Sequence, residues 1–154
     1  MRDVCAEVEQ DSRKGKRKWS KTNFARRIAY IERIVSNPAF KGKLDFAVYR
    51  NSLDYTTLTV RTITRALKLK RETDYRATVF IDGLARALEQ TVGLNLRRSG
   101  IPAKKVRGIK KDETSELIRL ADAVCGFVRD AMEGQREIRA LFERGIQNGV
   151  LVNL

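Results

Sequence analysis

The sequence predicts an α/β domain in which helices flank a layered sheet. Segments with strand-like alternation and segments with helical three-to-four spacing of apolar residues alternate along the chain. The length of 154 residues suits one domain with a hydrophobic core, expected over residues 21–154. Hydrophobic residues make up 42% of the chain, an ordinary share for a folded protein, so extensive disorder is not expected.

The first part of the chain is expected to form a lead-in and one helix. Residues 1–20 show little periodicity, which predicts an irregular basic segment. Ser20 or Thr22 is a candidate cap for a helix that continues to about Ser36. The helix should end before Pro38, because a residue that precedes proline avoids the helical conformation.

The middle of the chain predicts two strands and a helix. Alternating side chains in 43–50 (KLDFAVYR) predict a strand with one buried face. Residues 54–70 are ambiguous, since their threonines favour a strand while the apolar spacing favours a helix capped by Asp54. We predict the helix, because the segment is longer than a normal strand. Ala77–Ile81 is mostly apolar on both faces, as in a central strand covered by helices.

The remaining elements continue the alternation. Leu84, Leu88 and Val92 predict a helix that ends at Ser99-Gly100. The other expected elements are a short strand at Val106–Ile109, a helix that begins near 112–115 and ends near Gly134, a final amphipathic helix containing Ile138, Leu141 and Phe142, and an apolar tail at Val150–Leu154. Only three strands are visible, which is few for a closed core.

The strongest global feature is positive charge. The chain has 32 Lys plus Arg against 19 Asp plus Glu, a formal net charge of +13. Two stretches, 13–27 and 97–111, contain many basic residues and no acid. Such clusters neutralise phosphates, so we expect a nucleic-acid partner. The candidate phosphate contacts are Lys14, Lys16, Arg17 and Lys18 in the first stretch and Lys104, Lys105 and Arg107 in the second.

The basic stretches also fit an ordinary solvated surface, and Trp19 fits either base stacking or packing.

Composition excludes several kinds of site. With no His and only two Cys, a structural zinc site is nearly excluded and histidine-based nucleophilic catalysis is excluded. No apolar run is long enough to span a membrane, and we expect a cytoplasmic protein with reduced Cys5 and Cys125.

Two carboxylates are candidate metal ligands. Asp82 ends the strand ATVFID, and the carboxyl ends of strands in α/β sheets are where ligands collect. It fits equally well a cap of the helix that follows. Asp122 stands in the otherwise apolar run LIRLADAVCGFV. A buried carboxylate must be paired, protonated or bound to metal, and Arg119 and Arg129 are its local candidate partners.

The residues beside Asp122 in sequence are small. Ala121, Ala123 and Gly126 are small enough to let a backbone or a ligand approach closely. Asp82 and Asp122 together would hold Mg²⁺, with Mn²⁺ as the alternative ion, for phosphodiester cleavage. Asp112 is the best further ligand, although a helix cap is the commoner role for such a residue; Glu113, Asp45 and Asp54 are the other acids considered.

Two motifs resemble the DUF3800 family of bacterial proteins, which is placed among ribonuclease H-like folds. The more specific motif is ETSELIRLADAVCGFVRDA, in which Ser115, Leu120-Ala121-Asp122, Gly126 and Arg129 fit the family pattern. The strand VFIDGL, which contains Asp82, is a weaker match. The resemblance covers about residues 19–132. It implies a ribonuclease H-like fold and a metal-dependent nuclease site, with Asp82 and Asp122 as acidic ligands.

The chain departs from this family at its start. The family begins with a strand that bears an Asp-Glu-Ser stretch, whose aspartate is expected to anchor the metal. This chain has no such stretch, and Arg2-Asp3 is not set in an apolar strand. The chain therefore resembles the C-terminal two-thirds of a family member, truncated at its N-terminus.

Three functions are therefore expected in order. The first is a ribonuclease H-like, magnesium-dependent nuclease domain that binds nucleic acid. The second is a nucleic-acid-binding module without catalysis, which predicts salt-sensitive binding and no cleavage. The third is a protein-interaction or oligomeric subunit, in which an exposed sheet edge and the tail at 150–154 dock on a partner.

Overall fold

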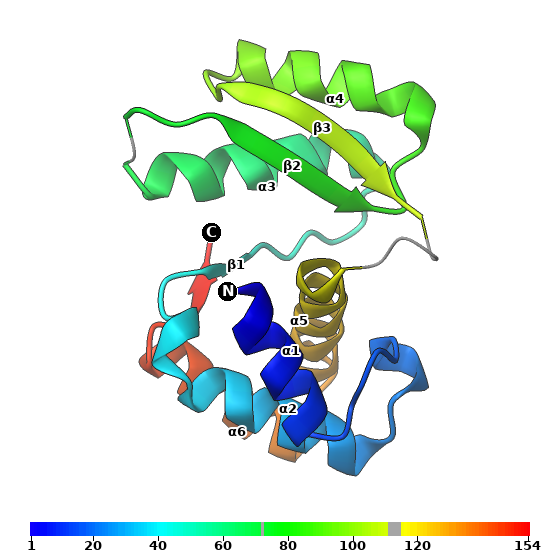
Figure 1. Cartoon of the computed structure of the whole chain (residues 1–154), viewed down its shortest axis with the longest axis vertical. Helices are drawn as coiled ribbons and strands as arrows, with labels where there is room; N and C mark the ends of the chain where they lie inside the picture. The colour runs from blue at the N-terminus through cyan, green and yellow to red at the C-terminus, as the bar shows by residue number, and fades with distance from the viewer. Residues whose placement is uncertain (72, 111–114) are drawn as a thin grey trace. The chain divides into compact units, whose positions relative to one another are not determined.

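The computed structural model describes residues 1–71, 73–110 and 115–154. The chain is α/β and divides into two compact units (Figure 1). Unit 1 combines Met1–Phe46 with Ser115–Asn153, and unit 2 contains Ala47–Thr114 and Leu154. No helix among the described residues has the length and hydropathy needed to cross a bilayer.

Unit 1 is mostly helical, with its chain segments drawn from both ends of the sequence. Its elements are α1 (Arg2–Asp11), η1 (Trp19–Lys21), α2 (Phe24–Ser36), η2 (Pro38–Phe40), β1 (Leu44–Phe46), α5 (Glu116–Met132), α6 (Arg136–Gln147) and β4 (Leu151–Asn153). The short strands β1 and β4 pair in parallel, with Leu44 opposite Leu151. Large fully buried side chains, including Trp19, Tyr30, Phe40 and Phe127, form its core.

Unit 2 is a β–α–β arrangement with one additional helix. Its elements are α3 (Tyr55–Leu69), β2 (Ala77–Asp82), α4 (Arg86–Arg98) and β3 (Ala103–Ile109). The strands β2 and β3 pair in parallel, and α4 connects them. In Figure 1 both strands lie in front of α3 and α4. The core of unit 2 joins the inner side of this sheet to Val60 on α3 and to Val92 and Leu96 on α4.

Close packing in unit 2 explains why residue 108 is a glycine. A Cβ at Gly108 would overlap the backbone carbonyl of Leu84, which follows β2. The Gly108 N–H also donates to the Glu89 carboxylate on α4 (2.8 Å). Residue 108 therefore fixes how closely β3 approaches the connection to α4.

Most expected elements are present, but the strand expected at 43–50 is limited to Leu44–Phe46, with Val48 exposed beyond it. Three further expectations are wrong. Residues 2–11 form α1 instead of an irregular lead-in, because Cys5 and Val8 enter the core of unit 1 and anchor one helical face. The strand at 77–82 is not covered on both faces, since Phe80 is 43% exposed. The apolar tail is not a free docking segment, because Val150 and Leu151 are buried and β4 pairs with β1.

The cap of α2 differs from the expected one, while the end of α2 and the cap of α3 are as predicted. Asn23 caps α2 by accepting the Arg26 N–H (3.0 Å), while the earlier candidate Ser20 lies inside η1. The helix ends at Ser36, and Asn37 before Pro38 is extended, as predicted. Residues 55–69 form a helix whose cap is Asp54, also as predicted.

Candidate functional site

Asp122 lies on α5 and accepts a hydrogen bond from a residue far away in the sequence. Its Oδ2 accepts a hydrogen bond from the backbone N–H of Trp19 (2.8 Å), the first residue of η1. The two expected partners are engaged elsewhere: Arg119 with Glu9 and Glu116, and Arg129 with Asp130 and Glu133. Asp122 is half-buried, and this bond satisfies an N–H at the start of a helical turn.

The small residues on α5 admit the indole of Trp19. A Cβ at Gly126 would overlap the Trp19 ring, so glycine is required for this approach. The close approach predicted for this surface is thus made by the chain's own Trp19. Since the Trp19 side chain is only 1% exposed, it is a packing residue and cannot stack a base.

Asp130 is a buried carboxylate that the sequence analysis did not single out. Its Oδ2 accepts from the Trp19 indole Nε1–H (2.7 Å) and from Arg27 (3.1 Å), and its Oδ1 accepts from Arg129 (3.0 Å). The Arg27 guanidinium also lies over the Trp19 ring, 5.1 Å from a ring centroid. The sequence did offer one sign of these contacts: Asp130 is a second acid on the same helix, eight residues after Asp122.

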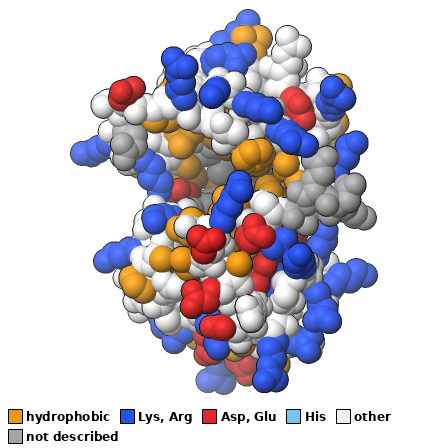
Figure 2. Space-filling view, viewed as in Figure 1, with side chains coloured by type: hydrophobic (Ala, Val, Ile, Leu, Met, Phe, Trp, Pro, Cys, Tyr) orange, Lys and Arg blue, Asp and Glu red, His pale blue; other side chains and the backbone are white. Residues whose placement is uncertain are grey.

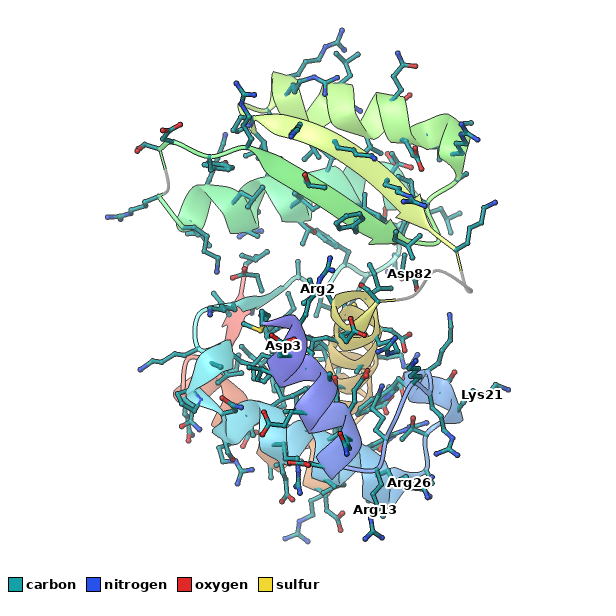
Figure 3. All side chains as sticks on the ribbon, viewed as in Figure 1. Arg2, Asp3, Arg13, Lys21, Arg26 and Asp82 are labelled. Atoms are coloured by element: carbon teal, nitrogen blue, oxygen red, sulfur yellow. The ribbon has the colours of Figure 1, made fainter. Side chains whose placement is uncertain are left out.

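Asp82 ends β2, as Figure 3 shows, and does not cap the following helix. Gly83 has a φ of +72°, and α4 begins at Arg86 with Ala85 as its N-cap. The capping interpretation of Asp82 is therefore wrong. Among the described residues, no hydrogen bond or ion pair involves its carboxylate.

The predicted magnesium ligands are distributed over both compact units and beyond the described residues. Asp82 belongs to unit 2 and Asp122 to unit 1, while Asp112 and Glu113 lie outside the described residues. Across residues 1–71, 73–110 and 115–154, no group of three or more Asp, Glu, Cys or His side chains is placed to hold a metal ion. Asp54 is used as a cap, and Asp3 lies on α1 (Figure 3).

Lys14 is fully buried and so cannot reach a phosphate at the surface. Its Nζ lies 3.7 Å from the Glu9 carboxylate and 4.8 Å from the centroid of the Tyr30 ring. Glu9 is also held by a two-bond contact with the Arg119 guanidinium (both 2.8 Å). Burial lowers the pKa of Lys14, and the Glu9 carboxylate opposes this shift. Lys14 belongs to the interior of unit 1, so its assignment as a phosphate contact is wrong.

The other cations of the first basic stretch remain at the surface of unit 1. Lys16 and Arg17 are exposed and Lys18 is partly exposed. Arg13 and Lys21 are exposed on the same connection and Arg26 is partly exposed at the start of α2 (Figure 3). This set, from 13 to 26, is called the α1–α2 basic loop.

The cations of the second stretch lie on β3. Lys104, Lys105 and Arg107 are all exposed. Lys105 and Arg107 point to the side of the sheet that α3 and α4 leave open, while Lys104 occupies the irregular position in the register near Ala77. Figure 2 shows hydrophobic side chains exposed among Lys and Arg side chains over this unit. All three side chains are thus solvent-exposed.

The contrast between the two stretches shows what sequence reasoning missed. Charge density alone did not separate the buried Lys14 from its exposed neighbours, and it did not identify Phe80 beside the β3 cations. Comparison with protein-family models, with curated proteins and with solved structures gave no match to this chain.

Proposed function

We propose that the chain is a nucleic-acid-binding module that contacts the phosphate backbone through exposed basic side chains. The observation that carries this proposal is the exposure of Lys104, Lys105 and Arg107 on one strand, within a stretch without Asp or Glu. Cations grouped without intervening acids release condensed counterions when they neutralise phosphates.

The α1–α2 basic loop supports the same function in unit 1. Its exposed residues carry the first acid-free stretch, and the acids nearest in sequence, Glu9 and Asp11, have their own basic neighbours. With a net charge of +13, long-range attraction would draw a polyanion to the chain. Binding of this kind depends weakly on base sequence, because phosphate contacts position a nucleic acid without reading it.

The ribonuclease H-like architecture and the metal-dependent cleavage implied by the family resemblance remain predictions. One observation supports binding without catalysis: the Asp122 carboxylate already accepts the Trp19 N–H and so holds a segment of the chain. A nuclease role would need Asp112 or another molecule's groups to complete a metal site.

The proposal is tested by measuring binding to fluorescent oligonucleotides across salt concentration. The variant Lys104→Gln/Lys105→Gln/Arg107→Gln removes the β3 cations. The matched control Arg136→Gln/Arg139→Gln/Arg144→Gln removes three exposed cations from α6, so each variant has a net charge of +10 in place of +13. Fluorescence anisotropy gives Kd from about 50 to 200 mM salt.

We expect the β3 variant to bind more weakly and to lose about 2 to 3 units from the slope of log affinity against log salt, about 0.7–0.9 for each phosphate contact removed. The α6 variant should retain most of the affinity and slope. Equal losses in the two variants would show that net charge alone attracts the nucleic acid. Absence of binding by the wild-type chain at low salt would refute the proposed function.

A further inference from the structure

One face of the β2–β3 sheet of unit 2 is covered by α3 and α4, and the other is exposed at residues 78, 80, 105 and 107 and buried at Ile109. Ala77, Val79 and Ile81 on β2 join the core that α3 and α4 complete. Because side chains alternate along a strand, Thr78 and Phe80 point to the other side. The register places Thr78 beside Lys105 and Phe80 beside Arg107, so these four residues form the open face.

Phe80 is a large aromatic residue that is exposed on this face. Its side chain is 43% exposed, and residues 78, 105 and 107 beside it are also exposed. A phenylalanine in this position leaves apolar area in water, which is unfavourable unless a ligand covers it. A lone exposed apolar residue is common on protein surfaces, so the neighbours decide what it can bind.

The neighbours of Phe80 are cations. Arg107 lies on the adjacent strand, and neighbouring strands are about 4.8 Å apart. Lys105 and Arg107 are two positions apart on β3, or about 6.6 Å along the strand. The acid on these two strands is Asp82, at the carboxyl end of β2. The open face thus combines an aromatic ring, two cations and a hydroxyl, with a carboxylate at one end.

We propose that this open face binds single-stranded nucleic acid, with a base stacked on Phe80 and phosphates held by Lys105 and Arg107. The inference deepens the proposed function, on which it rests, by naming the class of nucleic acid. Every base has a π-face, so a ring on a basic sheet binds single strands with little sequence preference. In a duplex the bases are already stacked on one another and cannot reach Phe80. Asp82 repels phosphates, so the strand extends from Phe80 toward Thr78.

The test compares single-stranded and duplex oligonucleotides with substitutions of Phe80. Phe80→Leu keeps an apolar side chain of similar size and removes the ring, whereas Phe80→Tyr keeps a ring. Tyr55→Leu is the control, because Tyr55 is a 60% exposed aromatic residue of the same unit at the start of α3. Thermal unfolding of each variant establishes that it is folded.

We expect the wild-type chain to bind the single strand more tightly than the duplex. Phe80→Leu should weaken single-strand binding at least about fivefold and change duplex binding little, since a base stacked on an aromatic ring contributes a factor of roughly 5 to 150. Phe80→Tyr and Tyr55→Leu should bind like the wild type. Asp82→Asn should tighten binding, which is the opposite of its effect on a metal site.

A second measurement observes stacking directly. The chain has one tryptophan, Trp19, which is buried and so gives a constant background. In Phe80→Trp, titration with a single strand should quench the new fluorescence, while a duplex should not. If the wild type binds nucleic acid but Phe80→Leu has no effect and Phe80→Trp is not quenched, the stacking inference is wrong and the proposed function stands. If neither oligonucleotide binds, both fail.

Discussion

At the scale of single residues, Trp19 explains both carboxylates of α5 that face the core of unit 1. Asp122 accepts its backbone N–H and Asp130 accepts its indole N–H. Gly126 lies between them in sequence and leaves room for the ring. An acid in an apolar helical run therefore serves here to hold a separate segment of the chain in place. This role needs only an acceptor atom, whereas Mg²⁺ is usually held by one or two charged carboxylates.

The first prediction separates these two roles of Asp122. Asp122→Ala leaves the Trp19 N–H without its acceptor and should lower the free energy of unfolding by about 1–3 kcal/mol. Asp122→Asn keeps an acceptor oxygen and should lose less than half as much. Urea denaturation of the three proteins measures the difference. Equal losses in both variants would show that the charge matters and would favour an ionic role.

Tyr30 is the second residue whose surroundings make a measurable prediction. It is fully buried in unit 1, and its hydroxyl has no hydrogen-bond partner among the described residues. Burial raises the pKa of Tyr30 well above its ordinary value of 10.0, and the nearby Glu9 carboxylate adds to this effect. In the unfolded chain the phenol ionises near its ordinary pKa, while in the folded chain it stays protonated.

The second prediction follows from that difference. Stability from Tyr30 is fully present below about pH 10 and is lost as the pH rises further, because only the unfolded state releases the proton. At neutral pH the free energy of unfolding of Tyr30→Phe should equal that of the wild type or exceed it by about 1 kcal/mol. This difference between variant and wild type should widen between about pH 10 and 11. Tyr55→Phe, at an exposed tyrosine, is the control. A gap independent of pH would contradict the raised pKa.

At the scale of elements, helix caps and hydrogen bonds within a turn determine where the helices begin. Asn23 caps α2, and Asp54 caps α3 through the Thr57 N–H (3.0 Å). The threonines of α3 favour strands elsewhere, but here Thr62 donates its hydroxyl to the Leu58 carbonyl one turn earlier (2.8 Å). The apolar spacing of Val60, Ile63 and Leu67 supplies the face that packs in unit 2.

The third prediction concerns the cap of α2. Asn23→Ala removes the acceptor of the Arg26 N–H and should destabilise the protein by about 0.5–2 kcal/mol, while Asn23→Asp should retain most of the stability. Ser20→Ala is the matched control, because Ser20 is exposed in η1 and caps no helix. Chemical denaturation checks all three variants. A larger loss for Ser20→Ala than for Asn23→Ala would contradict the cap assignment.

At the scale of the whole molecule, the two acids on which the metal hypothesis depends belong to different compact units. Asp122 belongs to unit 1 and Asp82 to unit 2. The exposed cations are found in both units, on the α1–α2 basic loop and on β3. Positive charge is therefore a property of the whole chain, while the aromatic ring that would give it a preference for single strands belongs to unit 2.

The fourth prediction tests the metal hypothesis, which implies that Mg²⁺ binds the folded state. In that case Mg²⁺ should raise the thermal midpoint beyond the effect of KCl at equal ionic strength, since a ligand of the folded state stabilises it. Asp82→Asn should abolish the rise, and Asp45→Asn in unit 1 should not. Calorimetry or a dye-based melt gives the midpoints. An unchanged response in Asp82→Asn would show that Asp82 does not bind the ion.

The amino-acid sequence by itself determined the order and approximate extent of most helices and strands. Apolar periodicity, Asp54 as a cap and Pro38 as a stop act over a few residues, so they can be recognised in the sequence. The sequence also determined the positive charge and the absence of histidine. It was misleading for α1, whose few apolar residues form a helix because they pack in unit 1.

Only the tertiary structure decided which contacts each candidate residue makes and whether it is buried or exposed. Asp122 and Trp19 are 103 residues apart in sequence, and Glu9 and Arg119 are 110 apart, so no local pattern predicted either contact. The same holds for Lys14, which is buried, and for Phe80, which is exposed. Burial depends on which distant segments cover a side chain, and that is settled by packing rather than by the residues next to it in sequence.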